Sequence, residues 1–266
     1  MKKVLSVQDL SCLGKCSLAV ALPTLSTMGC SCTVLPTAIL STHTGFPAPH
    51  IRALTEDMGE ICRHWQRIGA SFDAISVGYL SDPAQVARVE QVLDAFPATV
   101  ILDPVMGDHG KLYSRITDAH VQAMKKLIRR CDVLLPNITE AAYLTGLPYK
   151  ETGDTAYYAA LLEGLSALGA KNVVLTGVSL TRGKTGFMLA DGSVYQTETL
   201  PGSFHGTGDL FAAVFTGAYA PGKALPAATL AARFVEQVIE SSEPSPFGVA
   251  FEKHLPWLQA QLSDMP

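Results

Sequence analysis

A carboxylate follows two closely spaced glycines at the start of a strongly helical segment. Gly206, Thr207 and Gly208 precede Asp209, and the apolar run Leu210–Phe215 continues from it. Glycines allow the backbone to approach a ligand closely, and the first turn of a helix presents unpaired N–H groups with a positive dipole end. This pattern suits phosphoryl transfer to an alcohol, with Asp209 accepting the hydroxyl proton and the N–H groups stabilising the phosphate charge. The alternative is an ordinary glycine-rich turn in which Asp209 only caps the helix.

Two further acidic segments carry oxygen atoms that could serve a metal ion or a phosphate. Asp103 and Asp108 enclose a Pro-Val-Met-Gly turn, and Asn137 and Glu140 stand three residues apart where a helix is expected to begin after Pro136. Residues at this spacing lie on one side of a helix. Carbonyl and carboxylate oxygens placed in this way suit Mg²⁺ held through water and nucleotide phosphates. The alternatives are turn chemistry for the first segment and a capping pair for the second.

Single residues exclude two better-known phosphate-binding motifs. The Gly-Lys-Thr sequence at residues 183–185 resembles the end of a P-loop, but Val178 stands where that motif needs glycine, so a hairpin turn is expected instead. A dinucleotide-binding fingerprint would need glycine at the position of Phe211. Neither motif is therefore present.

The composition excludes several classes of protein. The chain has 266 residues, 48% of them hydrophobic and 17% charged, which is typical of a folded core rather than of disorder. A formal net charge of −4 and a pI near 6.0 give no basic signature for nucleic acid or for anionic membranes. The uncharged span Cys16–Ile51 is interrupted by Pro23, Gly29 and Pro36, so it predicts a buried helix and a buried strand rather than a membrane span.

The cysteines indicate a reducing compartment. None of the six falls in a C-x-x-C pair, no histidine pair completes a zinc pattern, and a disulfide framework is not expected in a chain of this size. Their apolar surroundings predict reduced, buried thiols of a cytoplasmic protein. The six are Cys12, Cys16, Cys30, Cys32, Cys62 and Cys131.

Short β-branched runs alternate with longer amphipathic segments along the chain. A helix is expected to open at Ser81–Ala84, with Ser81 or Asp82 as its cap and Pro83 in its first turn, and to bury an apolar side from Val86 to Phe96. The alternation predicts one α/β domain over residues 1–266, with a mostly parallel central sheet and helices on both faces. The expected strands are Val4–Val7, Thr33–Leu40, Ala74–Val77, Val100–Leu102, Val133–Leu135 and Val173–Leu175.

Small, polar or acidic residues follow each expected strand. Because the carboxyl ends of parallel strands meet at one edge of a sheet, these residues are expected to converge on a single ligand site. Any one of them could be ordinary loop chemistry, but six such strand ends favour a site. They are Gln8 and Asp9, Ser41–Thr44, Gly78 and Tyr79, Asp103, Asn137, and Thr176 and Gly177.

Taken together, these motifs resemble those of the ribokinase superfamily, whose fold is a three-layer α/β/α arrangement. The resemblance rests on Gly206–Asp209 running into Leu-Phe-Ala-Ala, on Asp103-Pro-Val-Met-Gly and on Pro136-Asn-x-x-Glu. Ser41-Thr-His-Thr-Gly and Gly78-Tyr-Leu, in this order and spacing, are similar to the pyridoxal kinase and pyridoxamine kinase branch. The resemblance covers nearly the whole chain.

The resemblance implies ATP-dependent phosphorylation of the 5′-hydroxymethyl group of pyridoxal, pyridoxine or pyridoxamine. It makes Asp209 the general base and Gly206, Thr207 and Gly208 the anion hole, and it places Mg²⁺ near Asp103 and Glu140 through water. Positions that match the ATP site are Asp103, Asp108, Asn137, Glu140 and Thr176, and positions that match the pyridine site are Asp9, Thr44, Gly45 and Tyr79.

The resemblance also implies which partners the chain has. The expected partners are a small-molecule substrate and ATP, with no nucleic acid and no membrane. Members of the family are usually homodimers, often require K⁺ and close a loop over ATP. Residues 108–115, which include Tyr113, are the expected loop.

Several positions depart from the family pattern. Asp9 stands where many relatives carry serine against the pyridine ring, and its carboxylate would favour a protonated ring nitrogen or the aminomethyl group of pyridoxamine. Gly177 stands where some relatives have a basic or hydroxyl side chain. His205 replaces a small apolar residue and is expected to be a packed histidine, and His43 is expected to be a hydrogen-bonded core histidine.

Two other functions remain open at this stage. A hydroxymethylpyrimidine kinase of the same superfamily would phosphorylate a similar heteroaromatic alcohol, and a catalytically silent protein could bind vitamin B6 without consuming ATP. Tyr79 and Thr44 favour a vitamin B6 substrate, and an intact Asp209 with its anion hole argues against a silent binder. A sugar or nucleoside kinase is less favoured, because the N-terminal third is too short for the lid strands that those enzymes insert.

Overall fold

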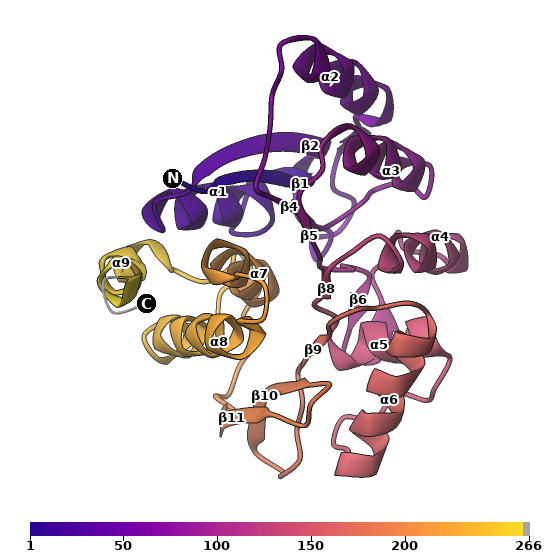
Figure 1. Cartoon of the computed structure of the whole chain (residues 1–266). Helices are drawn as coiled ribbons and strands as arrows, with labels where there is room; N and C mark the ends of the chain where they lie inside the picture. The colour runs from indigo at the N-terminus through magenta and orange to yellow at the C-terminus, as the bar shows by residue number, and fades with distance from the viewer. Residues whose placement is uncertain (263–266) are drawn as a thin grey trace.

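The computed structural model describes residues 1–262, and at its centre is a six-stranded sheet with the strand order β3-β2-β1-β4-β5-β8 (Figure 1). β1 pairs in parallel with β2 and β4, and the parallel pairing continues through β5 to β8, whereas β3 is antiparallel to β2. The predicted mostly parallel α/β sheet is confirmed. The strands are β1 (Lys3–Leu13), β2 (Ser31–Thr42), β3 (Ile51–Ala53), β4 (Ala74–Val77), β5 (Thr99–Leu102) and β8 (Val133–Leu134).

A second sheet extends the first one. The parallel bridges Leu134–Val173 and Asn137–Thr176 join the two sheets, and antiparallel pairing follows from β9 to β10 and β11. The turn before β10 contains Gly183 with φ 83°, so the hairpin predicted at the Gly-Lys-Thr sequence is confirmed. These strands are β9 (Val174–Thr176), β10 (Lys184–Leu189) and β11 (Val194–Glu198), and a separate hairpin pairs β6 (Gly107–Asp108) with β7 (Lys111–Leu112).

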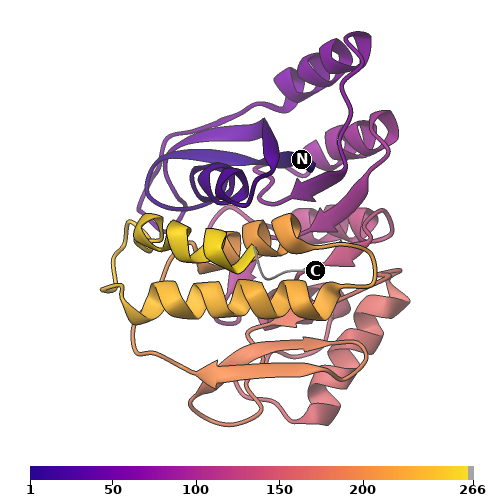
Figure 2. The same ribbon diagram turned by 60° about the vertical axis from the view of Figure 1, so that its left-hand side comes forward.

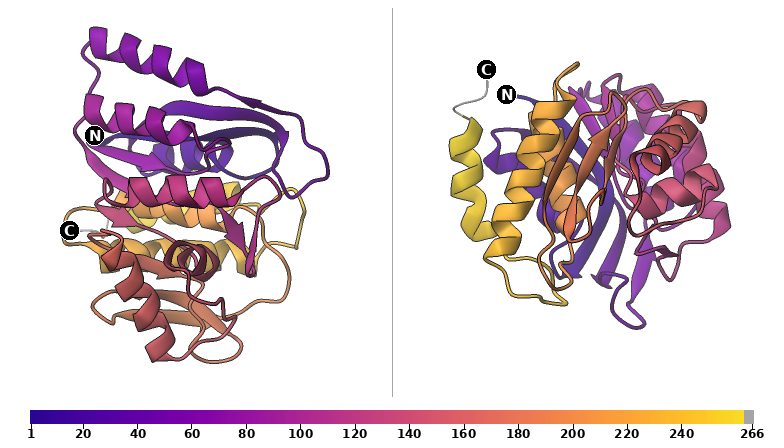
Figure 3. Two further views of the ribbon diagram at one scale, coloured as in Figure 1. Left: turned by 90° about the vertical axis from the view of Figure 1, so that its right-hand side faces the viewer. Right: turned by 90° about the horizontal axis from the view of Figure 1, so that it is seen from below.

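Helices cover both faces of the sheet, which gives three layers (Figure 3). The five helices from α2 through α6 pack on one face of the sheet through one hydrophobic cluster. Helices α1, α7, α8 and α9 pack on the other face through a second cluster. In Figure 2, α8 and α9 lie in front of the sheet. The helices are α1 (Leu18–Thr27), α2 (Thr55–Arg67), α3 (Gln85–Ala95), α4 (Asp118–Ile128), α5 (Ile138–Thr145), α6 (Thr155–Ala167), α7 (Thr207–Ala218), α8 (Ala224–Glu240) and α9 (Leu255–Leu262), with a 3₁₀ turn at Glu252–His254.

The uncharged span folds as the predicted helix and strand, α1 and β2. α1 is buried through Leu18, Val20 and Leu25, but β2 is only half-buried, and Ile39 is 40% exposed. Within residues 1–262, no helix combines the length and the apolar character that are needed to cross a membrane.

The cysteines are free thiols, as predicted. Four of them are buried, but Cys12 is exposed, contrary to the prediction. The reason is the alternation of β1, in which Ser11 faces inward and its neighbours Leu10 and Cys12 face outward. The buried four are Cys16, Cys30, Cys62 and Cys131.

β1 and β2 are longer than the apolar runs that predicted them. They continue to Leu13 and Thr42, beyond the carboxyl end of β4. The register between them shifts between Gln8 and Leu10, so that Asp9 alone faces two residues of β2. Asp9 therefore lies at an irregularity inside a strand and not, as predicted, after its end. Such irregularities change the direction in which a side chain points.

α3 begins at Gln85, later than predicted, because Ser81–Ala84 forms a separate turn. The fully buried side chain of Gln85 holds this turn: its Oε1 accepts the N–H of Ser81 at 2.9 Å, and its Nε2 donates to the carbonyl of Thr37 at 2.6 Å. The hydroxyl of Thr37 donates in turn to the carbonyl of Tyr79 at 2.9 Å. The apolar side from Val86 to Phe96 is buried as predicted. These contacts fix the backbone of Tyr79, two residues after the end of β4.

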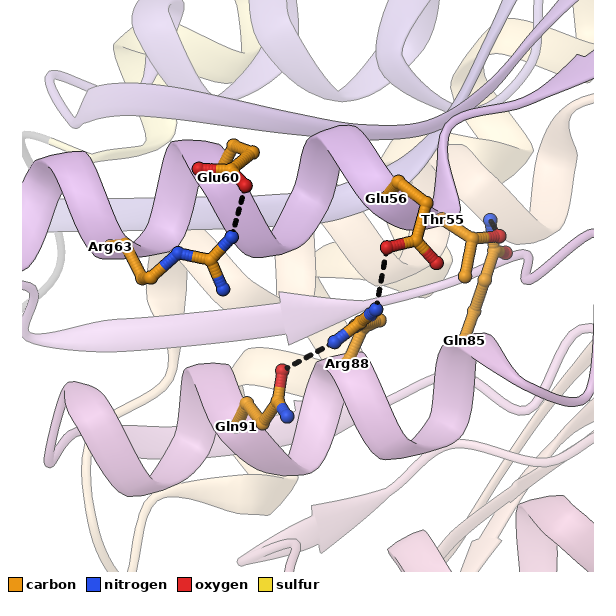
Figure 4. Close-up of polar contacts among 7 residues, drawn as sticks. All are labelled: Thr55, Glu56, Glu60, Arg63, Gln85, Arg88 and Gln91. Carbon is orange, nitrogen blue, oxygen red and sulfur yellow. Dashed lines mark hydrogen bonds and ion pairs between the residues drawn. The ribbon is translucent and has the colours of Figure 1, made fainter.

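α2 and α3 are also joined at the surface (Figure 4). Arg88 of α3 donates to Glu56 of α2 at 2.8 Å and to Gln91, one turn further along α3, at 3.2 Å. Arg63 pairs with Glu60 within α2. Exposed pairs of this kind contribute little to stability, so burial of the apolar faces is what attaches these helices to the sheet.

Lys2, directly before β1, binds the C-terminal end of α7. Its ammonium group donates to the carbonyls of Thr216 and Tyr219, each at 2.7 Å. The last carbonyls of a helix have no intrahelical partner and form the negative end of its dipole, so a cation at this position stabilises the helix. Burial lowers the pKa of Lys2, so its charge depends on these carbonyls for the solvation that it has lost.

We expect Lys2→Met to lower the free energy of unfolding by about 2 kcal/mol, because hydrogen bonds from a charged group are lost and buried carbonyls remain without a donor. Urea-induced unfolding followed by circular dichroism measures this change. Lys3→Met is the matched control: its ammonium group donates only to the exposed Ser71 hydroxyl at 3.3 Å among the described residues, so the expected change is within about 0.5 kcal/mol. Equal losses in the two variants would contradict a specific role for Lys2.

Candidate functional site

The N-terminal end of α7 is open and has unpaired N–H groups. Gly206 precedes the helix with φ 85°, and a Cβ atom there would collide with the carbonyl oxygen of Lys15, so only glycine fits. A Cβ atom at Gly208 would meet no heavy atom within 4 Å, so the space above the first turn is free. The first N–H groups of a helix have no intrahelical partner, and here those of Thr207, Gly208 and Asp209 border this space. The geometry suits an anionic group.

Asp209 lies in the first turn of α7, between two acidic regions. Burial raises the pKa of its carboxyl group to about 7; the negative charge of Asp9 adds to this shift, and the N–H and hydroxyl groups of Ser17 oppose it. On its other side, Asp209 is close enough to raise the pKa of Asp103. A carboxyl group with a pKa near neutrality is suited to accept a proton from a hydroxyl group.

Asp9 and Tyr79 are buried on one side of Asp209. Asp9 is 3% exposed and accepts a hydrogen bond from the Ser11 hydroxyl at 3.0 Å. Burial raises the pKa of Asp9, and the hydroxyls of Ser17 and Ser11 oppose this shift. The hydroxyl of Tyr79 has no partner within residues 1–262, and burial, together with Asp9, raises its pKa to about 12. A carboxylate and an unpaired phenol hydroxyl are therefore available to a polar ligand here.

The turn after β2 brings Thr44 and Gly45 toward the start of α7. His43 accepts the N–H of Gly45 at 3.2 Å and donates to the carbonyl of Pro246 at 2.7 Å, and its ring centroid lies 4.9 Å from that of His205. His43 is hydrogen-bonded as predicted but is partly exposed rather than in the core. His205 packs its ring against that of His43, as predicted, but it lies in the exposed loop before α7 and not in the core.

Asn137 and Glu140 cap α5 on the other side of Asp209. Asn137 Oδ1 accepts the N–H of Glu140 at 2.9 Å, and the Glu140 carboxylate accepts the N–H groups of Asn137 at 2.9 Å and Met106 at 3.0 Å. Burial raises the pKa of Glu140 to about 8, and these N–H groups oppose the shift. Burial and the carboxylates of Glu140 and Asp209 hold the pKa of Asp103 well above its usual range.

The loop expected to close over ATP is a short hairpin, β6–β7, docked on α5. Asn137 Nδ2 donates to the carbonyl of Gly107 at 2.8 Å, and the hydroxyl of Thr139 accepts the N–H of Gly110 at 3.0 Å. Tyr113 follows the hairpin and lies among the acidic groups of the site. Burial and four carboxylates raise its pKa, and these carboxylates belong to Glu140, Asp108, Asp209 and Asp103.

Thr176 ends β9 next to the start of α5. It is bridged to Asn137, and its hydroxyl donates to the carbonyl of Pro136 at 3.3 Å. Gly177 follows with φ 73°, a conformation that favours glycine. The structure therefore arranges the predicted residues in two groups, one that reaches Asp209 through Asp9 and one that reaches it through Asp103. One group contains Asp9, Thr44, Gly45 and Tyr79, and the other contains Asp103, Asp108, Asn137, Glu140 and Thr176.

The acidic groups near α5 fit Mg²⁺ when water and phosphate complete its coordination. The neighbouring carboxyl groups of Asp103 and Glu140 have raised pKa values, which a divalent cation would reverse. Among the described residues, no group of three or more His, Cys, Asp or Glu side chains is arranged to hold a metal ion. Mg²⁺ commonly binds one or two carboxylates and retains several waters, so this donor set suits it.

The structure adds Ser17 to the site, a residue to which the sequence motifs did not point. Ser17 precedes α1 and is 5% exposed, and its N–H and hydroxyl groups lower the pKa of Asp209 against the larger effect of burial. A serine before an apolar helical run normally signals an N-cap. Its side chain makes no capping hydrogen bond, however, and no sequence signal distinguishes this arrangement from an ordinary cap.

The chain is similar in sequence to known kinases over most of its length. The sequence model of the phosphomethylpyrimidine kinase family matches residues 19–251. The pyridoxine/pyridoxal/pyridoxamine kinase of Bordetella bronchiseptica is 29% identical over 258 residues, which are 90% of this chain and 88% of that protein.

Two solved structures are similar over the full length. The pyridoxal kinase of Lactobacillus plantarum is 32% identical, with a TM-score of 0.88 and coverage of 99% of both chains. A protein of Bacteroides thetaiotaomicron, described as a phosphomethylpyrimidine kinase and crystallised with pyridoxal, is 35% identical, with a TM-score of 0.89 and coverage of 100% of this chain and 96% of that one. The chain therefore belongs to the phosphomethylpyrimidine kinase family, in the branch of the ribokinase-like fold that includes the pyridoxal kinases.

Proposed function

We propose that this chain transfers the γ-phosphoryl group of ATP to the hydroxymethyl group of a vitamin B6 vitamer: pyridoxal, pyridoxine or pyridoxamine. The observation that carries the proposal is the position of Asp209 at the open start of α7. Near it lie the buried carboxylate of Asp9 with the unpaired hydroxyl of Tyr79, and also Asp103 with Glu140. In this proposal the first pair meets the polar ring and the second pair meets the nucleotide phosphates.

Asp209 acts as the general base in this proposal. It accepts the hydroxyl proton while the hydroxyl oxygen bonds to the γ-phosphorus and the bond from that phosphorus to the ADP oxygen breaks. The N–H groups at the start of α7, those of the N-cap Gly206 and of Thr207 and Gly208 in the first turn, stabilise the charge on the transferring phosphoryl oxygens in this proposal. A positioned base of this kind contributes about 100- to 10,000-fold to a rate.

The group around α5 binds the nucleotide in this proposal. Asn137, Thr176 and the β6–β7 hairpin with Asp108 line the approach of the phosphates. Mg²⁺, held by Asp103 and Glu140 through water, would neutralise phosphate charge there. Hydrogen bonds to Asn137 and Thr139 hold the hairpin against the start of α5, beside this group.

Asp9, Tyr79 and the turn with Thr44 and Gly45 bind the substrate ring in this proposal. The similarity to a pyridoxal kinase over 99% of both chains supports a B6 vitamer. A buried carboxylate is most stable next to a cation, so Asp9 favours the protonated ring nitrogen or the ammonium group of pyridoxamine.

Hydroxymethylpyrimidine is the second candidate substrate. The match to the phosphomethylpyrimidine kinase family over residues 19–251 favours it. Its ring nitrogens could also reach Asp9 and Tyr79. A panel of substrates therefore has to include it.

We expect ADP release with Mg-ATP and at least one B6 vitamer, and a loss of about 100- to 10,000-fold in kcat for Asp209→Asn, because the variant cannot accept the proton. A coupled ADP assay with pyridoxal, pyridoxine, pyridoxamine, hydroxymethylpyrimidine, ribose and adenosine measures this. Asp57→Asn, at an exposed position on α2, is the matched control and should retain activity. Turnover of hydroxymethylpyrimidine alone would overturn the proposal that the substrate is a B6 vitamer. Binding of pyridoxal without turnover of any compound would indicate a catalytically silent binding protein.

The pH dependence follows from the raised pKa of Asp209. Because the base must be ionised, kcat/KM is expected to fall about tenfold per pH unit below an apparent pKa near 7, and to level off above it. A pH series from 5 to about 9.5 with the best vitamer measures this limb. If kcat/KM instead fell only at pH values near the ordinary pKa of a carboxyl group, this would contradict a role for Asp209 as a base with a raised pKa.

We expect Asp9→Ser to lower kcat/KM for pyridoxamine at least about tenfold more than for pyridoxine, because a charged hydrogen bond to the substrate is lost. Steady-state kinetics with both vitamers, in wild type and variant, give this ratio. Asp9→Asn, which keeps the shape and removes the charge, should show the same selectivity. Equal losses for the two vitamers would rule out a charge-selective role for Asp9.

A further inference from the structure

A short segment after α8, residues 246–249, lies against the candidate site. It has no regular secondary structure. Phe247 is 45% exposed, whereas Val249 is 1% exposed and belongs to the hydrophobic cluster that contains α7 and α8. None of the motifs that predicted the site lies in this segment. Its contacts nevertheless reach three of the segments that form the site.

The first contact is with the turn after β2. Because His43 Nδ1 accepts the N–H of Gly45 at 3.2 Å, Nε2 carries the ring hydrogen and donates it to the carbonyl of Pro246 at 2.7 Å. The ring centroids of Phe46 and Phe247 lie 5.3 Å apart, so side chains of the same two segments also pack together. His43 therefore uses both of its ring nitrogens to attach this turn to the segment.

The other two contacts are with the loops that meet at the start of α7. The carbonyl of Phe247 accepts the N–H of Lys15, in the β1–α1 loop, at 2.7 Å. The N–H of Val249 donates to the carbonyl of His205, directly before Gly206, at 3.2 Å. The carbonyl of Lys15 in turn packs against Gly206, where a Cβ atom would collide with it. The segment therefore contacts both loops at the open helix start.

Gly248 allows the segment to approach both loops closely. Its φ is 95°, and a Cβ atom there would lie 2.7 Å from the Cβ atom of Lys15 and 3.2 Å from the carbonyl oxygen of His205. Cβ contacts shorter than 3.0 Å essentially do not occur, so any side chain at this position would force the segment and the β1–α1 loop apart. The place of the segment against the start of α7 thus depends on this glycine.

We infer that residues 246–249 are a positioning segment, which holds the turn with Thr44 and Gly45 at a fixed place relative to the start of α7. The inference rests on the proposed function, in which Thr44 and Gly45 bind the substrate ring and Asp209 acts on its hydroxyl group. One substrate must fit both places at once, and a misplacement of about 1 Å can cost about 100-fold in rate. Within residues 1–262, the segment makes no hydrogen bond to the group around α5 that binds the nucleotide in that proposal.

Gly248→Ala tests this inference, with Gly222→Ala as the matched control. Both glycines have a positive φ, of 95° and 77°, so both variants acquire the same kind of backbone strain. A Cβ atom at Gly222 would meet no heavy atom within 4 Å, so only Gly248→Ala displaces the segment. We expect kcat/KM for the best B6 vitamer to fall about 10- to 100-fold in Gly248→Ala and to stay within about twofold in Gly222→Ala. The KM for ATP should stay within about twofold in both.

His43 supplies a second test, which introduces no clash. His43→Phe keeps a ring beside Phe46 and loses both hydrogen bonds, whereas His43→Gln can still donate to the carbonyl of Pro246. We expect His43→Phe to raise the KM for the vitamer about tenfold without raising the KM for ATP, and His43→Gln to recover most of this loss. This pair of variants decides the question if Gly248→Ala does not fold.

Two measurements do not depend on activity. Exchange of single backbone N–H groups with deuterium, followed by NMR in the protein without ligands, reports on the three contacts. The N–H groups of Lys15, Gly45 and Val249 should exchange at least about tenfold faster in Gly248→Ala than in Gly222→Ala, because one displacement releases three segments. The dissociation constant of pyridoxal, measured by calorimetry, should rise about tenfold in Gly248→Ala alone.

The outcomes separate this inference from the proposed function. Faster exchange and weaker pyridoxal binding in Gly248→Ala support the inference, even if the wild type phosphorylates no alcohol. Unchanged binding and unchanged kcat/KM in a folded Gly248→Ala overturn it, even if Asp209→Asn is inactive and the proposed function stands. Faster exchange without a change in binding or kcat/KM also overturns it, because the role of residues 246–249 would then be structural. A wild type that binds no compound of the substrate panel would overturn both.

Discussion

Four carboxyl groups with raised pKa values lie near one another at the carboxyl edge of the sheet: those of Asp9 and Glu140 are buried, and those of Asp103 and Asp209 belong to half-buried residues. Burial is the main cause, and repulsion between neighbouring groups adds to it for Asp103 and Asp209. A carboxylate that is shielded from water is tolerated only where hydrogen-bond donors face it. Glu140 receives backbone N–H groups at the start of α5, and Ser17 presents its N–H to Asp209 at the start of α1. The acidic residues at this edge of the sheet therefore depend on hydrogen-bond donors at the N-terminal ends of α5 and α1.

This arrangement makes the stability of the protein depend on pH and on ligands. A carboxyl group whose pKa is higher in the folded state contributes most at pH values below its unfolded pKa. That contribution is lost as the pH rises through the folded value, which is about 7 for Asp209 and about 8 for Glu140. At neutral pH the acidic site thus opposes folding, whereas a bound cation or cationic ligand restores stability. A site that is unfavourable when empty and favourable when filled is a common compromise between stability and function.

α7 connects this edge to the rest of the fold. Its first turn lies against the carbonyl of Lys15, its apolar side is buried among α1 and α8, and its last carbonyls are bound by Lys2. Because β1 also carries Asp9, one strand and one helix position both Asp9 and Asp209.

The sequence by itself determined the features that depend on neighbouring residues. The parallel sheet, the open helix start at Gly206–Asp209 and the pairing of Asn137 with Glu140 follow from short-range patterns of burial, glycine and capping. The tertiary structure alone decided that Asp9 lies inside β1, that Ser17 has a positive φ and that Cys12 and His205 are exposed. The register of β1 against β2 places Asp9, and the contact of Lys15 with Gly206 places Ser17. These are contacts between segments far apart in the chain, and no local pattern contains them.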